Sequence, residues 1–534
     1  AGSGKTRVLV ERVLQRILEG DPPQEIDRLL VVTFTNAAAA EMKQRIGAAL
    51  EKAIRENPGV PHLRRQLLLL NRASISTVHS FCMDVIQRYY YLRDLDPSFR
   101  ILDETEAELL RADVLEELLE EYYENNEAES PFYRLADIYS DDRGDRSLQM
   151  LILRLYDFSR SHLQPERWLR EKAGAFALEG AGELERTAWV RELLYACRLE
   201  LENILGRLKE ALRLCREPGG PEPYAGSLED EIAALQAICS AAGNSWGDLM
   251  EAMQLPVFGR LRPCKGSSYE EALKERVKQI RDECKKALGK LREQHFQRPL
   301  AEQAEDLKLL APLLDTLVEL VIDFAGRYSR AKGEKGAADF SDLEHYALQI
   351  LSSPDSPGDT LLPSAAVPEY GDIFLPSPAA LEYRERFSEV LVDEYQDINA
   401  VQEAILKLVA MPEPGGNMFM VGDVKQSIYR FRLAEPELFL QKYKEYSSGE
   451  QPGESIALAR NFRSRREILA GVNYLFEQIM DETVGEVKYD REARLLYGAS
   501  YPDPSPEDGE NPYAPELLLI DRSGAPGEGD GTPG

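Results

Sequence analysis

Five short apolar runs, each followed by a helical pattern, constrain the fold of this chain more than any other feature. They are residues 29–34, 75–79, 389–393, 418–423 and 455–459. Strands that are apolar along their whole length and alternate with helices are typical of a parallel sheet covered by helices on both faces. The sequence therefore predicts an α/β fold, and its 534 residues are enough for several domains.

The stretch between about residues 100 and 345 has a different pattern. Apolar residues recur there at three- and four-residue steps, as from Leu273 to Leu291, which predicts one amphipathic helix after another. We interpret residues 101–345 as a helical domain inserted into an α/β domain made of residues 1–100 and 346–445. Residues 446–534 would begin a second domain and run into a Pro- and Gly-rich, partly disordered end.

Charge and cysteine usage limit the possible classes of protein. The 64 basic and 93 acidic residues give a net charge of −29, which by itself counts against nucleic acid as a partner. Residues 103–129 hold 12 of the acids and form either a solvated helix face or a docking surface. Residues 273–298 are basic, and form either a solvated helix or a phosphate-tracking face.

Six scattered cysteines argue against a zinc site, and no apolar run reaches the roughly 20 residues that span a membrane.

The first residues, AGSGKT, match the end of the phosphate-binding pattern G-x-x-x-x-G-K-[ST]. In such a loop the small residues, here Gly2, Ser3 and Gly4, let backbone N–H groups face phosphates at a helix N-terminus. Lys5 would reach the β- and γ-phosphates of ATP, and the Thr6 hydroxyl would ligate Mg²⁺. The first glycine of the pattern and its strand would lie upstream, so we expect the chain to be a fragment.

The apolar run at 389–393 ends in crowded carboxylates, which repel one another unless a cation lies nearby. A strand followed by Asp-Glu is the Walker B arrangement. Asp393 would hold Mg²⁺, and Glu394 would orient and deprotonate the attacking water. An Asp-Glu pair alone more often forms an ordinary turn, but its combination with a phosphate loop favours the catalytic interpretation.

Further segments supply candidate sensor and finger residues. Gln426 follows a predicted strand and would lie near the γ-phosphate. Arg463 precedes a helix whose start resembles a capping box formed by Ser464 and Glu467. This position makes Arg463 a candidate arginine finger.

Four aromatic or imidazole side chains are candidate contacts for single-stranded DNA. Tyr429 and Phe431 alternate with arginines, a pattern that suits single strands because every base has a face on which a ring can stack. Phe34 is either a core residue or a stacking ring. His79 is either a structural histidine or part of the same DNA track.

Taken in order, these segments resemble motifs I, Ia, Ib, II, III and IV of superfamily 1 DNA helicases of the UvrD/PcrA/RecB type; they are AGSGKT, TFTNAAAAEM, STVHSF, VDEYQD, GDVKQSIYRFR and NFRS. Their detailed forms, with DFSDLEHYAL at 339–348, are similar to the AddA (RexA) family of helicase–nuclease proteins. The resemblance implies a RecA-like P-loop domain with a 1B-like helical insertion, followed by the start of a second RecA-like domain. It also implies ATP and Mg²⁺ as cofactors and the residue roles given above.

The resemblance implies a cytoplasmic enzyme that moves 3′→5′ along single-stranded DNA and processes double-strand-break ends for recombinational repair, with AddB (RexB) as partner. The complete protein would also be an exonuclease. We expect motifs V and VI and the nuclease domain to lie outside these 534 residues, so the isolated chain should hydrolyse ATP poorly. Alternatives are a stand-alone UvrD/PcrA-like repair helicase, a helical scaffold with a degenerate nucleotide site, and a nucleotide switch without a DNA role.

Overall fold

The computed structural model divides the chain into two compact units. Unit 1 comprises Ala1–Val114, Asp157–Pro165 and Arg327–Gly534, and unit 2 comprises Leu115–Tyr156 and Glu166–Gly326. The structure describes residues 2–20, 22–93, 96, 98–140, 144–264, 269–353, 374–412, 415–449, 452–482, 485, 487–503 and 511–519. The end predicted to be disordered lies, from residue 520 on, outside these described residues.

Unit 1 contains a four-stranded, all-parallel sheet in the order β2-β1-β5-β6. The strands are β1 (Leu29–Thr33), β2 (Ser74–Thr77), β5 (Glu389–Val392) and β6 (Met418–Met420). The register pairs Val32 with Val392 and Val392 with Met420, so the carboxyl ends of three strands lie at one edge of the sheet. The predicted α/β fold with a parallel sheet is therefore confirmed.

The prediction of a strand at 455–459 is wrong. No regular strand forms there, and Ile456 and Leu458 are exposed. The nearest strand is β7 (Arg460–Asn461), which pairs with β8 (Leu496–Tyr497). An apolar run becomes a strand only where a neighbouring strand pairs with its backbone along the run, and of the described strands β8 reaches only Ala459, which accepts a hydrogen bond from the N–H of Leu496.

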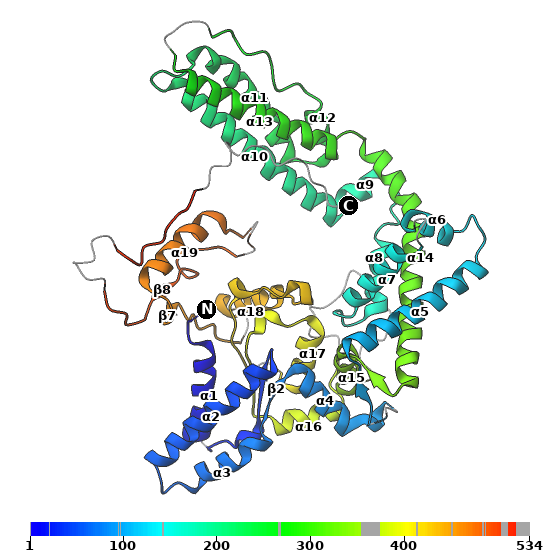
Figure 1. Cartoon of the computed structure of the whole chain (residues 1–534), viewed down its shortest axis with the longest axis vertical. Helices are drawn as coiled ribbons and strands as arrows, with labels where there is room; N and C mark the ends of the chain where they lie inside the picture. The colour runs from blue at the N-terminus through cyan, green and yellow to red at the C-terminus, as the bar shows by residue number, and fades with distance from the viewer. Residues whose placement is uncertain are drawn as a thin grey trace. The chain divides into compact units, whose positions relative to one another are not determined.

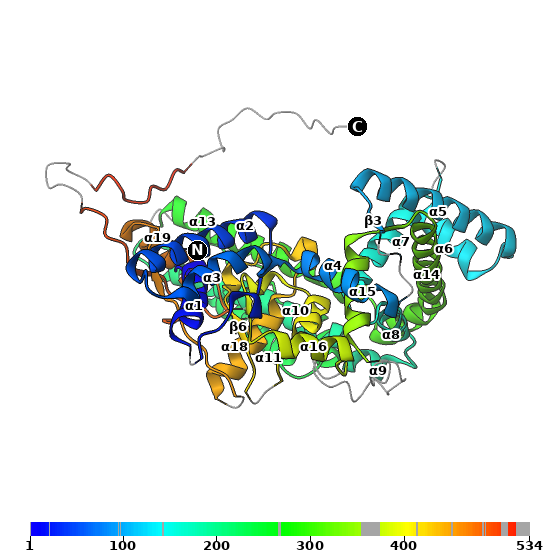
Figure 2. The same cartoon turned by 90° about the horizontal axis from the view of Figure 1, so that it is seen from below.

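Helices cover both faces of the sheet (Figures 1 and 2). Leu29, Val31 and Leu391 pack with α1, α2 and α3, whereas Leu30 and Val392 pack with α4, α15, α16 and α17. Successive residues of a strand point to opposite faces, so a strand buried on both sides must be apolar throughout. The helices are α1 (Lys5–Glu19), α2 (Asn36–Glu56), α3 (Pro61–Leu69), α4 (Val78–Tyr89), α15 (Phe340–Leu351), α16 (Pro378–Arg386) and α17 (Ala400–Val409).

Helix α1 is anchored to strand β5 by a buried carboxylate. Glu389, at the start of the strand, is 3% exposed and accepts hydrogen bonds from Arg12 and Arg16 of α1. The guanidinium of Arg12 also lies 4.5 Å from the centre of the Phe419 ring of β6. These contacts fix the helix that follows the predicted phosphate loop against the middle of the sheet.

Unit 2 is all-helical over its described residues, in keeping with a helical insertion. Its largest core is formed mainly by α10, α11, α12 and α13, where Glu231 and Arg281 form a buried ion pair. Figure 1 shows α10, α11 and α13 side by side. The helices that lie in or enter this unit are α5 (Glu104–Asn125), α6 (Pro131–Tyr139), α7 (Arg146–Ser159), α8 (Pro165–Gly174), α9 (Ala181–Arg186), α10 (Ala188–Arg216), α11 (Ala225–Ala242), α12 (Trp246–Met253), α13 (Glu271–His295) and α14 (Leu300–Glu334).

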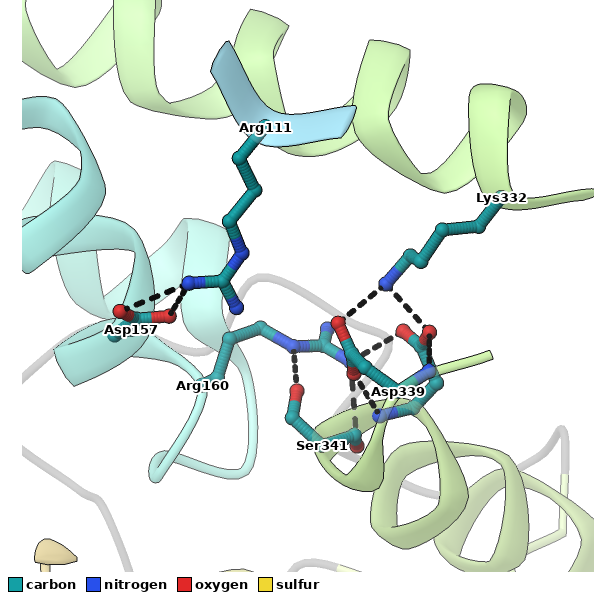
Figure 3. A network of polar contacts seen from close by, with 7 residues as sticks. Arg111, Asp157, Arg160, Lys332, Asp339 and Ser341 are labelled. Atoms are coloured by element: carbon teal, nitrogen blue, oxygen red, sulfur yellow. Dashed lines mark hydrogen bonds and ion pairs between the residues drawn. The ribbon is translucent and has the colours of Figure 1, made fainter. Parts of the chain in front are cut away.

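A charged network in unit 1 joins the segments that lead to and from unit 2 (Figure 3). Lys332 of α14 is 1% exposed and contacts Asp339 at 2.8 Å and Asp342 at 2.5 Å. Arg160 donates to Ser341 at 2.6 Å and also pairs with Asp342. The start of α15, where Asp339 and Asp342 cap each other, is therefore held by two cations from separate segments.

We predict that this network stabilises unit 1 substantially. Lys332→Ala would leave two buried carboxylates without their shared cation, so the free energy of unfolding should fall by about 3–5 kcal/mol in urea titrations. Lys308→Ala on the same helix removes an exposed pair with Glu305 and should cost less than about 1 kcal/mol. Equal losses in the two variants would contradict this prediction.

Candidate active site

The first residues form a loop that ends at the N-terminus of α1. Gly2 and Gly4 have φ values of 87° and 86°, which side-chain-bearing residues rarely adopt. A Cβ atom on Gly2 would also lie 2.7 Å from the Cβ of Arg463, so space and backbone conformation both require glycine there. With Ser3 between them, the glycines precede the unpaired N–H groups of a helix start, where anions bind.

Lys5 and Thr6 both reach the acidic residues that follow β5. Lys5 is 8% exposed and its ammonium donates a hydrogen bond to Glu394, and the Thr6 hydroxyl bonds to Asp393. The Glu394 backbone is left-handed at φ 52°, a strained conformation for a residue other than glycine. The structure thus brings together four predicted site residues from two segments 388 positions apart (393 minus 5).

The site contains more negative than positive charge. Burial, reinforced by the charge of Glu394, raises the pKa of Asp393, although Lys5 and Thr6 oppose the shift. Burial and Glu394 also raise the pKa of Asp397 to about 6, and its Oδ1 atom is buried without a hydrogen-bond partner among the described residues. A further cation would relieve this imbalance.

The donor set fits Mg²⁺. A hydroxyl and a carboxylate, Thr6 and Asp393, lie together beside a helix N-terminus, and Mg²⁺ commonly takes one or two such oxygens and completes its shell with phosphate oxygens and water. Among the described residues, no group of three or more His, Cys, Asp or Glu side chains is arranged to hold a metal ion. A metal here would therefore depend on oxygens supplied by a bound phosphate.

Gln396, which the sequence analysis missed, connects the acidic pair to the segment after β6. Gln396 is 1% exposed, and its side-chain amide donates to Glu394 at 2.9 Å and accepts from the backbone N–H of Asp423 at 2.9 Å. Asp423 in turn accepts a hydrogen bond from Gln426 at 2.6 Å. Gln426 therefore reaches the acidic pair through two intermediates, and no local pattern marks the amide that joins them.

Three of the predicted DNA contacts form one aromatic cluster. Phe34 belongs to neither core of the sheet and stacks on Tyr429 with ring centres 4.8 Å apart. Tyr429 lies 5.9 Å from Phe431, which is 75% exposed, and the Arg432 guanidinium lies over both of these rings. Phe34 is thus part of a surface cluster, and its core interpretation is not supported.

His79 lies apart from that cluster, near the N-terminus of α4. Its Nε2 atom is 3.0 Å from the carboxylate of Glu344, and its ring meets the edge of Phe340. Glu344 is buried and also accepts hydrogen bonds from Asn399 and Gln402. No sequence pattern around His79 indicates that it has this buried partner.

Arg463 lies beside the phosphate loop. The N–H of Phe462 donates to the carbonyl of Gly2 at 2.9 Å, and the Asn461 side chain accepts from the backbone of Arg463. The capping box expected at Ser464 is wrong, because α19 (Arg466–Ile479) begins later and has no side-chain cap. Asn461, which also accepts from the N–H of Ser464, satisfies the turn instead.

We predict that Asp397 makes stability depend on pH. Its pKa of about 6 in the fold exceeds the ordinary value of 3.8, so ionising it destabilises the fold as pH rises from about 4 to about 6. Asp397→Asn should therefore raise the urea midpoint at pH 7.5, and the gain should shrink at pH 4.0. Backbone hydrogen bonds lower the pKa of Asp490, so Asp490→Asn should lose stability at pH 7.5. A gain for Asp397→Asn that is equal at both pH values would contradict the prediction.

Comparisons with known proteins agree with this geometry. The family model of the UvrD/REP helicase N-terminal domain matches residues 1–447. The chain is 50% identical over 527 residues to a Geobacillus kaustophilus protein and 49% identical over 530 residues to one from Bacillus licheniformis, both of which are named as part of an ATP-dependent helicase/nuclease. These matches cover 98% and 99% of this chain and 41% of each relative, so the chain spans about two-fifths of their length. The chain belongs to the family of the UvrD/REP helicase N-terminal domain.

Proposed function

We propose that this chain is the ATP-hydrolysing part of a motor that moves 3′→5′ along single-stranded DNA. The meeting of Lys5 and Thr6 with Asp393 and Glu394 at one edge of a parallel sheet carries the proposal. Ligands of open α/β sheets bind at the carboxyl ends of the strands, where this group lies. The presence of these four residues together argues against a scaffold with a degenerate nucleotide site.

Each residue of this group would have one role. The N–H groups after Gly2, Ser3 and Gly4 would bind phosphate oxygens, and Lys5 would exchange its contact with Glu394 for one with the β- and γ-phosphates. Glu394, released from Lys5, would then accept a proton from the attacking water.

Thr6 and Asp393 would hold Mg²⁺, which, when bound, neutralises charge on the phosphates. Gln426 would respond to the γ-phosphate through Asp423 and Gln396. The position of Arg463 beside the phosphate loop supports a role as arginine finger.

The aromatic cluster of Phe34, Tyr429 and Phe431 would form the base-stacking surface. His79 would contact the DNA strand at a position further along it. Stacked rings beside an arginine, with Phe431 exposed, suit a single DNA strand without sequence preference. In this proposal residues 1–100 and 346–445 form the first RecA-like domain, 101–345 the 1B-like insertion, and 446–534 the start of the second RecA-like domain.

For the whole protein, we propose a cytoplasmic helicase–nuclease that processes double-strand-break ends together with an AddB-type partner. The names of the relatives support this over a stand-alone UvrD/PcrA-like repair helicase. None of the helices among the described residues is long and apolar enough to cross a bilayer. ATP-dependent degradation of linear duplex DNA by the whole protein with its partner would distinguish the two; unwinding without degradation would favour the repair helicase.

We predict that Lys5→Ala in the whole protein lowers ATP hydrolysis and unwinding by at least about 100-fold, because charge on the transferring phosphoryl group would lose a stabilising cation. Binding of oligo(dT), followed by fluorescence anisotropy, should stay nearly unchanged. Arg7→Ala on the same helix removes an exposed cation and should leave all three measurements unchanged. Full activity of Lys5→Ala would refute the motor mechanism.

We also predict that Phe431→Ala weakens oligo(dT) binding by about 1–3 kcal/mol, the cost of losing one base–ring stack. The matched control is Ile428→Ala, which removes a neighbouring exposed apolar side chain that has no π-face. Equal effects of the two substitutions would show that apolar contact, and not stacking, holds the strand.

A further inference from the structure

Glu344 of α15 is a buried carboxylate that the proposed function does not yet use. It is 5% exposed, and both of its oxygens accept hydrogen bonds. Oε1 lies 3.0 Å from His79 Nε2 and 2.7 Å from Gln402 Nε2, and Oε2 lies 3.2 Å from Asn399 Nδ2. Burial acts to raise its pKa, but the contacts with His79, Gln402 and Asn399 outweigh burial and hold the pKa below the usual value.

Its donors come from two places with different proposed roles. His79 belongs to the turn at the start of α4 that would contact DNA. Asn399 is the N-cap of α17 and accepts from the N–H of Gln402 at 2.8 Å. Because Asn399 follows Asp397 by two residues, α17 begins where the acidic segment of the nucleotide site ends.

The start of α17 is also joined to the segment that follows the aromatic cluster. Glu435 accepts from the N–H of Ala400 at 3.2 Å and donates its own N–H to the carbonyl of Ile398 at 2.9 Å. The segment after the aromatic cluster therefore hydrogen-bonds directly to residues that follow the acidic segment, whereas the His79 turn reaches them through Glu344. Of these connections, the one through Glu344 depends on a buried charge.

Helix α15 gives Glu344 a fixed position. Near the start of the helix, Asp342 is held by Lys332 and Arg160, and His345 contacts the carbonyl of Arg160 at 2.9 Å. A buried carboxylate that loses a donor keeps its full desolvation cost. If His79 moved away, Glu344 would keep only its donors from α17, so the free-energy cost of moving the His79 turn depends on whether α17 stays in place.

We propose that Glu344 is a positioning residue that links the His79 turn to the start of α17, so that affinity for single-stranded DNA depends on the bound nucleotide. This inference rests on the proposed function, because it takes His79 as a DNA contact and residues 393–397 as part of the ATP site. Thermodynamic linkage requires that nucleotide and DNA then change each other's affinity by the same factor.

The test is the ratio of the Kd for oligo(dT) without and with a non-hydrolysable ATP analogue and Mg²⁺, measured by anisotropy on the whole protein. We expect about a fivefold ratio or more in the unmodified protein. Glu344→Gln keeps the shape of the side chain but turns an amide N–H₂ toward one of the three donors, which breaks at least one contact. The ratio should fall at least about threefold, toward 1, while the Kd without nucleotide changes less.

Two further variants separate positioning from simple stability. Asn399→Ser keeps a good helix cap but removes the donor to Glu344, and should also lower the ratio. Glu231→Gln alters a buried carboxylate of unit 2 that pairs with Arg281, and should lower the melting temperature without changing the ratio. These two results, together with the fall in Glu344→Gln, would support the inference.

The outcomes also distinguish this inference from the proposed function. If the unmodified protein fails to bind oligo(dT), the proposed function is wrong. If it binds with the expected ratio and Glu344→Gln or Asn399→Ser keeps that ratio, only the role of Glu344 is overturned. A ratio near 1 in the unmodified protein that binds oligo(dT) likewise overturns the role of Glu344 and leaves DNA binding intact.

Discussion

Three carboxylates within five consecutive residues lie close to one ammonium group, and this crowding organises unit 1. Lys5 contacts Glu394 directly, and its positive charge also opposes the raised pKa values of Asp393 and Asp397. Helix α1 can hold Lys5 there because Arg12 and Arg16 bind Glu389 at the other end of the same strand. One helix is thus fixed to both ends of β5. The site retains an excess of negative charge, which a metal ion and further cationic side chains nearby would balance.

The sheet and the meeting of distant motifs could be predicted from the sequence, because both follow from local rules. Runs such as 29–34 are apolar on both faces, and parallel strands place their carboxyl ends at one edge, so Asp393 had to lie near the ends of its neighbours. The strand predicted at 455–459 does not form, because an apolar pattern alone does not show whether a partner strand pairs along the whole run. The helix cap predicted at Ser464 does not form, because the side chain of Asn461 accepts the backbone hydrogen bond of that turn.

The polar connections behind the site could not be predicted for a different reason. Gln396 and Glu344 are buried by the fold, and their partners come from other segments, up to 265 positions away for His79 and Glu344 (344 minus 79). No periodicity or spacing encodes such a contact. Buried polar groups need partners, so only the three-dimensional arrangement reveals which residues satisfy them. These residues contact the predicted site residues directly, Gln396 through Glu394 and Glu344 through His79.

The charge distribution indicates how such a chain would hold DNA. A protein with a net charge of −29 repels a polyanion at long range, so attraction must be local. At the aromatic cluster, Arg430 is paired with Glu437, while Arg432 lies over Tyr429 and Phe431. The aromatic rings would therefore contribute more to the binding of a DNA strand than the arginine side chains would. Stacking tolerates every base because each base has a π-face, and a motor that must release and rebind each base in turn needs contacts of that kind.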